Sequence, residues 1–242
     1  VAGLAEARAL FEHFGVTVRE RSVDGRAVAP GATLLELDGP AQAILLVERT
    51  ALNIIGRMSG IATRTREAVD TVRAVSPEVR VAATRKTAPG LRVLDKKAVV
   101  LGGGDPHRWT LSDMVLIKDN HLALVPLPEA IRRAKQQSLY RLVEVEVETV
   151  EDAVTAAKAD ADLILLDNMR PDAVSEVVRV LAGRGLREGV TLEVSGGVAA
   201  GDLAGYAATG IDIISMGALT HTVRNFDVSL DILAGAGTVR IL

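Results

Sequence analysis

The alternation of apolar and polar residues predicts a mixed α/β protein in which strands and helices alternate over the C-terminal two thirds. Short apolar runs predict strands at 79–83, 115–117, 142–147, 163–166, 191–194 and 211–214. Most of the segments between them have apolar residues at helical spacing, at 128–137, 150–159, 172–182 and 201–208. Thr149, with Asp152 three residues later, predicts an N-terminal capping box for one of these helices. Strands that alternate with helices form βαβ units and therefore a parallel sheet.

The N-terminal quarter of the chain has a different pattern. Residues 4–14 carry apolar side chains at helical spacing, and residues 16–37 predict short strands separated by glycine and proline turns. A long helical region begins at Pro40, and Ser59-Gly60 predicts a break in it.

Charged or glycine-rich residues follow every predicted strand of the C-terminal repeat. In strand order they are Thr84-Arg85-Lys86, Lys118-Asp119-Asn120-His121, Glu146, Asp167-Asn168, Ser195-Gly196-Gly197 and Ser215-Met216-Gly217. In a β/α barrel these positions converge on the carboxyl-end face, where the active site is built. A single such step would be a solvated loop, but six in succession predict a functional site.

The charge balance changes sign along the predicted barrel. Residues 85–108 contain six Lys or Arg against two acids, together with His107, whereas residues 144–167 contain eight acids and one Lys. Solvated helix faces explain some of these charges, but not those directly beside strands. Guanidinium, ammonium and imidazole groups bind carboxylates or phosphates. Carboxylates bind a divalent metal, sugar hydroxyls or a developing positive charge.

The two glycine-rich steps favour a phosphate site. Loops after the last strands of β/α barrels commonly hold a phosphate on their backbone N–H groups. Either glycine-rich segment alone could simply form a tight turn, but here two such segments follow successive strands. These residues predict a phosphorylated, anionic ligand and do not by themselves select a reaction.

Composition limits the partners of the protein. Only six of its 242 residues are aromatic and the net charge is −3, so we expect no nucleic-acid partner. The longest stretch without Asp, Glu, Lys or Arg is the eleven residues Ile213–Val223, which is too short to cross a membrane, so no membrane partner is expected. The chain has no cysteine, which excludes disulfides and fits a reducing, cytoplasmic location.

Several long motifs resemble those of the quinolinate phosphoribosyltransferases. The most specific are TRKTAPGLR at 84–92, GGGDPHR at 102–108 and LIKDNH at 116–121. Further matches in the family's order lie at 39–41, 48–53, 59–63, 144–147, 165–169, 195–197 and 219–221. Ala88, Pro106, Trp109 and Thr110 depart from residues frequent in the family, but none of these departures removes a charged group.

The resemblance implies a pentosyltransferase, a nicotinate-nucleotide diphosphorylase (carboxylating). Such an enzyme transfers a phosphoribosyl group from phosphoribosyl pyrophosphate to quinolinate. Decarboxylation then gives nicotinate mononucleotide, with release of pyrophosphate and CO2, in de novo NAD biosynthesis. The implied cofactor is Mg²⁺, with Glu146 and Asp167 as its expected ligands, directly or through water.

The resemblance also implies roles for individual residues. The expected catalytic residues are Lys86, Lys118, Glu146 and Asp167. The expected substrate-binding residues are Arg49, Thr84, Arg85, Lys86, His107, Arg108, Lys118, Glu146, Asp167, Ser195, Gly196, Gly197, Ser215, Met216 and Gly217. Arg49 is expected to reach the active site of the neighbouring subunit in a homodimer, which could assemble further, although the sequence alone would favour a solvated arginine on a helix. Either Lys86 or Lys118 could assist decarboxylation electrostatically.

The implied fold is α/β, with an incomplete β/α barrel of six to seven parallel strands and an N-terminal open α/β sandwich domain. Residues 1–48 are expected to form the sandwich, and residues 49–221 the catalytic barrel. The tail 222–242, with a strand near Phe226–Asp231, is expected to return to the sandwich. Because the family has sequence before the point matched by Val1, we expect a native N-terminal segment to be missing from this chain.

Three other functions fit parts of the pattern. A molybdenum-transport-linked paralogue of the same fold would act on another acceptor, and the run 118–121 disfavours it. A thiamin-phosphate-synthase-like transferase would explain the glycine steps but not the motifs at 84–92 and 102–108. A non-catalytic regulator that binds nucleotides is disfavoured because every charged site position is retained.

Overall fold

The computed structural model describes residues 1–232 and 239–242, so part of the expected tail lies outside the described residues. The chain forms two compact units. The sandwich unit contains Val1–Arg66, Thr87–Gly104 and Ala218–Leu242, and the barrel unit contains Glu67–Lys86 and Asp105–Gly217. The boundary expected between residues 48 and 49 falls inside helix α2 (Ala41–Arg73).

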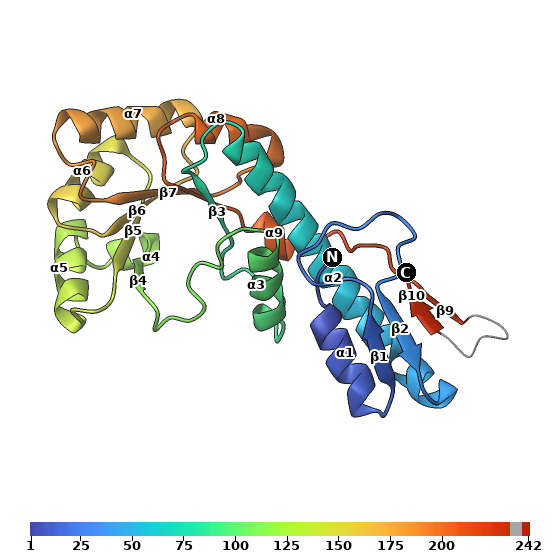
Figure 1. Ribbon diagram of the computed structural model, residues 1–242. Coiled ribbons are helices and arrows are strands. Elements are labelled where there is room, and N and C mark those ends of the chain that lie inside the picture. The colour runs from blue at the N-terminus through green and yellow to red at the C-terminus, as the bar shows by residue number, and fades with distance from the viewer. Residues whose placement is uncertain (233–238) are drawn as a thin grey trace. The chain divides into compact units, whose positions relative to one another are not determined.

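The barrel unit is built on a six-stranded parallel sheet (Figure 1). Its order is β3 (Arg80–Ala82), β8 (Ile213–Ser215), β7 (Thr191–Ser195), β6 (Leu163–Asp167), β5 (Val143–Val147) and β4 (Val115–Ile117). All neighbouring pairs are parallel. Sequential strands are neighbours except β3 and β4, which form the two edges. This confirms the expected incomplete barrel.

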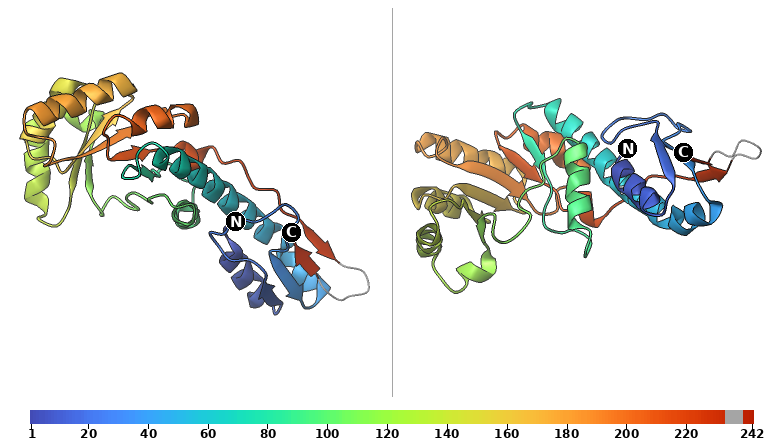
Figure 2. Two further views of the ribbon diagram at one scale, coloured as in Figure 1. Left: turned by 45° about the horizontal axis from the view of Figure 1, so that its top comes forward. Right: turned by 60° about the horizontal axis from the view of Figure 1, so that its bottom comes forward.

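Helices flank the strands of the barrel unit, and all of them except α4, which was not predicted, lie where the apolar spacing predicts helices. They are α4 (Asp119–Leu122), α5 (Leu127–Gln137), α6 (Val150–Lys158), α7 (Pro171–Gly183), the 3₁₀ turn η1 (Ala200–Asp202) and α8 (Leu203–Ala207). The views in Figures 1 and 2 show α5, α6 and α7 along the same side of the strands. Thr149 caps α6 as expected, because its Oγ1 accepts a hydrogen bond from Asp152 N at 3.0 Å. None of the helices in the described part of the chain is both long and apolar enough to cross a bilayer.

The sandwich unit has its own antiparallel sheet and core. The strand order is β1 (Thr17–Glu20), β2 (Leu35–Asp38), β10 (Val239–Ile241) and β9 (Leu230–Ile232). Helices α1 (Leu4–His13), α3 (Arg92–Leu101) and α9 (Ala218–His221) and most of α2 also belong to this unit. Phe11 of α1, Leu35 of β2, Ile44 of α2 and Ile241 of β10 are fully or almost fully buried in one apolar cluster. This is the expected open α/β sandwich.

The expected break at Ser59-Gly60 is wrong, because α2 is continuous through both residues. Ser59 is fully buried, and its Oγ accepts a hydrogen bond from Ala2 N at 2.9 Å and donates one to Ala2 O at 3.1 Å. A Cβ placed at Gly60 would lie 2.2 Å from the carbonyl oxygen of Arg224. Gly60 therefore permits close backbone approach rather than ending the helix.

Candidate active site

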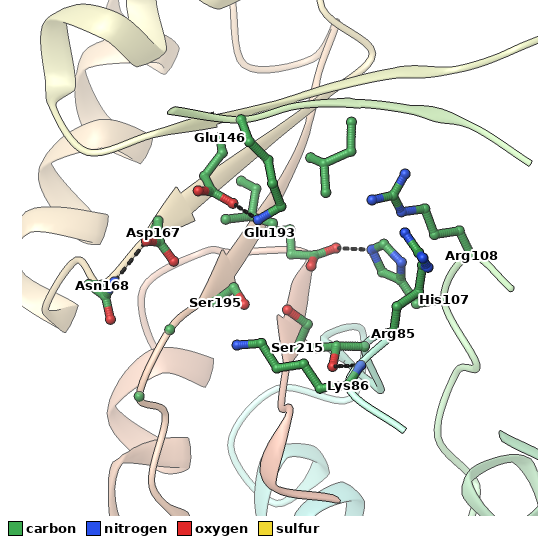
Figure 3. Close-up of a pocket in the computed structure, with 16 residues that line it drawn as sticks. Arg85, Lys86, His107, Arg108, Glu146, Asp167, Asn168, Glu193, Ser195 and Ser215 are labelled. Atoms are coloured by element: carbon green, nitrogen blue, oxygen red, sulfur yellow. Dashed lines mark hydrogen bonds and ion pairs between the residues drawn. The ribbon is translucent and has the colours of Figure 1, made fainter. Parts of the chain in front are cut away.

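A cavity of about 390 Å³ opens at the carboxyl ends of the parallel strands in the barrel unit (Figure 3). Its lining residues are Thr84, Arg85, Lys86, His107, Arg108, Leu116, Lys118, Glu146, Leu165, Asp167, Asn168, Glu193, Ser195, Gly196, Gly197 and Ser215. The structure therefore brings together all the expected site residues except Arg49, Met216 and Gly217. The carboxyl-end position is the one that active sites occupy in β/α barrels.

Three expected site residues are not part of the cavity lining. Met216 is buried, and its N donates to Ala82 O at 2.9 Å, so it joins β8 to β3 rather than lining the cavity. Gly217 is the next residue and is also absent from the lining. Arg49 belongs to the sandwich unit, where its side chain is 75% exposed and lies 3.9 Å from Glu48.

Pairing of Asp105 with β3 places the cationic residues of the site. Asp105 N donates to Val81 O at 2.8 Å, and Ala83 N donates to Asp105 O at 2.9 Å. The guanidinium of Arg80 also pairs with the Asp105 carboxylate. Residues 105–108 are thereby held against the strand that leads into Thr84-Arg85-Lys86, so that segments from both sides of α3 meet at one edge of the cavity.

Arg85, His107 and Arg108 lie together on one side of the cavity (Figure 3). His107 has a φ of 55°, a left-handed conformation that few residues adopt and that is often found at functional sites. Burial, and then the charge of Arg85, lower the pKa of Arg108. Within the described part of the chain, Arg85 Nε is buried without a hydrogen-bond acceptor. An anion bound beside these residues would relieve the repulsion between them.

Two carboxylates lie across the cavity from this cluster (Figure 3). Glu146 is in β5, and its Oε2 accepts a hydrogen bond from Lys118 Nζ at 2.6 Å. Asp167 ends β6, and its Oδ2 accepts one from Asn168 Nδ2 at 2.7 Å. Each contact uses one carboxylate oxygen. Mg²⁺ is commonly bound by one or two carboxylates together with water and substrate phosphate oxygens, so this pair of residues fits the ion.

The glycine-rich step after β7 has a backbone conformation that favours glycine. Gly196 and Gly197 have φ values of 86° and 58°. Asn168 N donates to Ser195 O at 2.9 Å, and a Cβ placed at Gly196 would lie 2.4 Å from Asn168 Oδ1. Only glycine fits there without displacing Asn168.

The sequence interpretation missed Glu193 and Glu144 as site residues. Glu193 lines the cavity from β7, and Glu144 lies in β5; their side chains are 1% and 0% exposed. Burial, and then the charge of Glu193, raise the pKa of Glu144 to about 8. His107 Nε2 lies 3.3 Å from Glu193 Oε2 and 3.8 Å from Glu144 Oε2. One ligand atom from each of these three residues lies within 4.8 Å of the others, so the trio could also hold a metal ion.

The signal for these acids was present in the sequence. Strands of a β/α barrel mostly direct Val, Ile and Leu into the interior. A glutamate at an interior strand position, as in VEVEV and TLEVS, is an exception that costs free energy and points to a functional role. Leu116, Leu165 and Asn168 also line the cavity and were not among the expected site residues.

An incomplete parallel barrel with clustered cations, opposed carboxylates and a glycine turn at its strand ends defines an enzyme for a phosphorylated anionic substrate. The family model described as Quinolinate phosphoribosyl transferase, C-terminal domain, matches residues 61–231, and the model of its N-terminal domain matches residues 1–59. The chain belongs to the quinolinate phosphoribosyl transferase family.

Individual relatives agree with this assignment. A probable nicotinate-nucleotide pyrophosphorylase (carboxylating) of Methanothermobacter thermautotrophicus is 45% identical over 234 residues, which is 96% of this chain and 84% of the relative. The nicotinate-nucleotide pyrophosphorylase (carboxylating) of Homo sapiens is 39% identical over 93% of this chain and 76% of its own. The crystal structure of NadC from Streptococcus pyogenes matches with a TM-score of 0.88 and 35% identity, over 99% of this chain and 82% of that one.

Proposed function

We propose that the protein catalyses the reaction of its relatives, in which a phosphoribosyl group passes from phosphoribosyl pyrophosphate to quinolinate and the product is decarboxylated. Nicotinate mononucleotide, pyrophosphate and CO2 are the products, as in de novo NAD biosynthesis. The observation that carries this proposal is one cavity in which Arg85, His107 and Arg108 lie across from Glu146 and Asp167, with the glycine turn at 195–197 in the same lining.

The cationic side suits the acceptor and the leaving group. Quinolinate carries two carboxylates, and Arg85, His107 and Arg108 provide guanidinium and imidazole groups for them. Fixing both carboxylates would orient the pyridine nitrogen for attack on the ribose carbon. Lys86 and Lys118 add ammonium groups for the pyrophosphate.

The acidic side suits the ribose. Loss of pyrophosphate develops positive, oxocarbenium-like charge on the sugar, and Glu146 and Asp167 would stabilise that charge. The same two carboxylates would hold Mg²⁺; the chemistry that the bound ion supplies is neutralisation of charge on the departing pyrophosphate. Ser195, Gly196, Gly197 and Ser215 would bind the 5′-phosphate.

Decarboxylation needs no covalent bond to the protein. Once the ring nitrogen is ribosylated, the pyridinium ring can accept the electron pair of the breaking C–C bond. The ring carbon then takes a proton as CO2 leaves. Lys86 or Lys118 would assist this step electrostatically.

A homodimer completes the proposal. The guanidinium of Arg49, which is largely exposed, would reach the quinolinate site of a second copy, as the family pattern implies. The protein would act in the cytoplasm. This compartment is reducing, so proteins there do not depend on disulfides, and this chain has no cysteine.

A turnover assay tests the proposal. Purified protein with Mg²⁺ and phosphoribosyl pyrophosphate should convert quinolinate, but not nicotinate, to nicotinate mononucleotide. Turnover of nicotinate with none of quinolinate would contradict the proposal. The same assay separates this function from that of a paralogue acting on another acceptor and from that of a non-catalytic regulator.

A further inference from the structure

The lining of the cavity contains a mostly buried imidazole–carboxylate pair. His107 Nε2 and Glu193 Oε2 are 3.3 Å apart, and their side chains are 12% and 1% exposed. Figure 3 shows the Glu193 carboxylate directed at the imidazole. Glu193 comes from β7 and His107 from the segment before β4, so the contact joins parts of the barrel unit that are distant in sequence.

The charges around His107 make this contact important. Arg85 and Arg108 lie beside it on the cationic side and oppose a positive charge on the imidazole, whereas the Glu193 carboxylate of β7 faces its Nε2 atom and favours that charge. Glu144 of β5 also faces Nε2, but burial raises its pKa to about 8, so it is mostly protonated near pH 7. A buried carboxylate is costly unless it has a cationic partner. Glu193 is the nearer of the two acids, and it lines the cavity.

We propose that Glu193 is a positioning residue for His107: it fixes the Nε2 edge of the imidazole and balances its positive charge. His107 then acts as a further cation beside Arg85 and Arg108 and binds a carboxylate of the pyridine substrate. The left-handed backbone of His107 supports this role, because the ring is held in a costly conformation that brings it to the acid. This inference rests on the proposed function and assigns a specificity role to a residue outside the expected site.

Glu193→Gln tests the inference, because it removes the charge while nearly preserving shape. The KM for quinolinate should rise about tenfold or more, as expected for loss of a charge-assisted contact, while the KM for phosphoribosyl pyrophosphate stays near that of the unchanged protein. Glu176→Gln is the matched control: this acid lies on α7 outside the cavity, paired with Arg179 at 2.6 Å, and should change neither KM.

A double-mutant cycle with His107→Asn separates positioning from a general effect on folding. Asn tolerates the left-handed conformation that residue 107 requires. In the His107→Asn background, Glu193→Gln should add little to the quinolinate KM. Equal effects in both backgrounds, or a rise of similar size in both KM values, would overturn the inference. Glu193→Asp, which keeps the charge, should bind quinolinate better than Glu193→Gln even if the latter folds poorly.

A Mn²⁺ titration followed by electron paramagnetic resonance tests whether His107, Glu144 and Glu193 instead hold a metal ion. If the protein without substrate binds one more ion than Glu193→Gln does, the acids hold a metal and the inference is overturned. Equal stoichiometry supports it. Failure of the proposed function would be seen in the unsubstituted protein, as no quinolinate turnover, whereas failure of this inference would be seen only in the variants.

Discussion

Lys118 Nζ lies 2.6 Å from Glu146 Oε2, so the cation that follows β4 and the acid of β5 form an ion pair at the mouth of the cavity. The Lys118 side chain is 46% exposed and that of Glu146 is 13% exposed. An exposed pair of this kind contributes little to folding stability. The pairing instead sets the positions of two groups that the proposed reaction needs on the pyrophosphate and the ribose.

Lys118→Ala should lower kcat/KM by about 10² to 10³, the usual effect of removing one electrostatic contact to a reacting group. Steady-state kinetics with quinolinate as the varied substrate would measure this. Lys135→Ala is the matched control, because Lys135 makes a contact of 2.7 Å with Asp162 outside the cavity. A loss of similar size in both variants would show that the ion pair matters only for structure.

Gly196→Ala should weaken binding of phosphoribosyl pyrophosphate strongly. The added Cβ would lie 2.4 Å from Asn168 Oδ1, and the φ of 86° is unfavourable for alanine. The variant would therefore displace Asn168, which donates to Asp167, and would disturb the turn that is proposed to hold the 5′-phosphate. We expect the KM for phosphoribosyl pyrophosphate to rise at least about tenfold, which corresponds to about 1.4 kcal/mol.

The control for this prediction is Gly201→Ala. Gly201 lies in η1, and a Cβ there would meet nothing within 4 Å. This substitution should leave both KM values unchanged. If Gly196→Ala also leaves the KM for phosphoribosyl pyrophosphate unchanged, the phosphate assignment of this turn is wrong.

Glu144 should make the free energy of unfolding depend on pH. Its pKa is raised from 4.5 to about 8 in the folded protein, mainly by burial. Between these values the unfolded chain releases the proton while the folded protein keeps it, so rising pH destabilises the fold. Glu144→Gln removes this contribution. Urea unfolding at several pH values would measure the free energy of unfolding of both proteins. The value for the variant, relative to that of the unsubstituted protein, should increase from about pH 5 to about pH 8. If the difference in free energy of unfolding between the two proteins does not change with pH, the raised pKa of Glu144 is contradicted.

Arg49 provides a test of the proposed dimer. Arg49→Ala and Lys118→Ala should each be nearly inactive, since each removes a cation from every site. After subunit exchange, a mixed dimer would contain one site with both residues intact, so mixing should restore part of the activity. Exchange can be verified with differently tagged chains. No recovery after verified exchange would show that the site is not shared between subunits.

Much of the barrel could be predicted from the sequence because each strand is a short apolar run followed directly by a polar or glycine step. Val115–Ile117 was predicted to the residue, and the other five strands to within two residues at either end. The strand-end rule also brought Glu146, Asp167 and Ser195 to one cavity, because parallel strands place their carboxyl ends on one face.

Other features depend on tertiary contacts that no local pattern encodes. Gly60 resembles a helix break until the carbonyl of Arg224 is found against it. Helix α3 was not predicted, because its segment carries buried charges at Asp95 and Lys96. Asp95 is buried because Arg57, which lies 38 positions earlier in the chain, donates two hydrogen bonds to it, at 2.8 and 2.9 Å. The unusual position of Glu193 inside a strand is visible in the sequence, but its contact with His107 forms only in the folded barrel.

The most direct test of the account uses quinolinate labelled in the carboxyl group beside the ring nitrogen. With phosphoribosyl pyrophosphate and Mg²⁺, the protein should release labelled CO2 in equal amount to the nicotinate mononucleotide and pyrophosphate formed, and Arg85→Ala should abolish all three products. No release of label in the presence of both substrates, or turnover of nicotinate in place of quinolinate, would contradict the account.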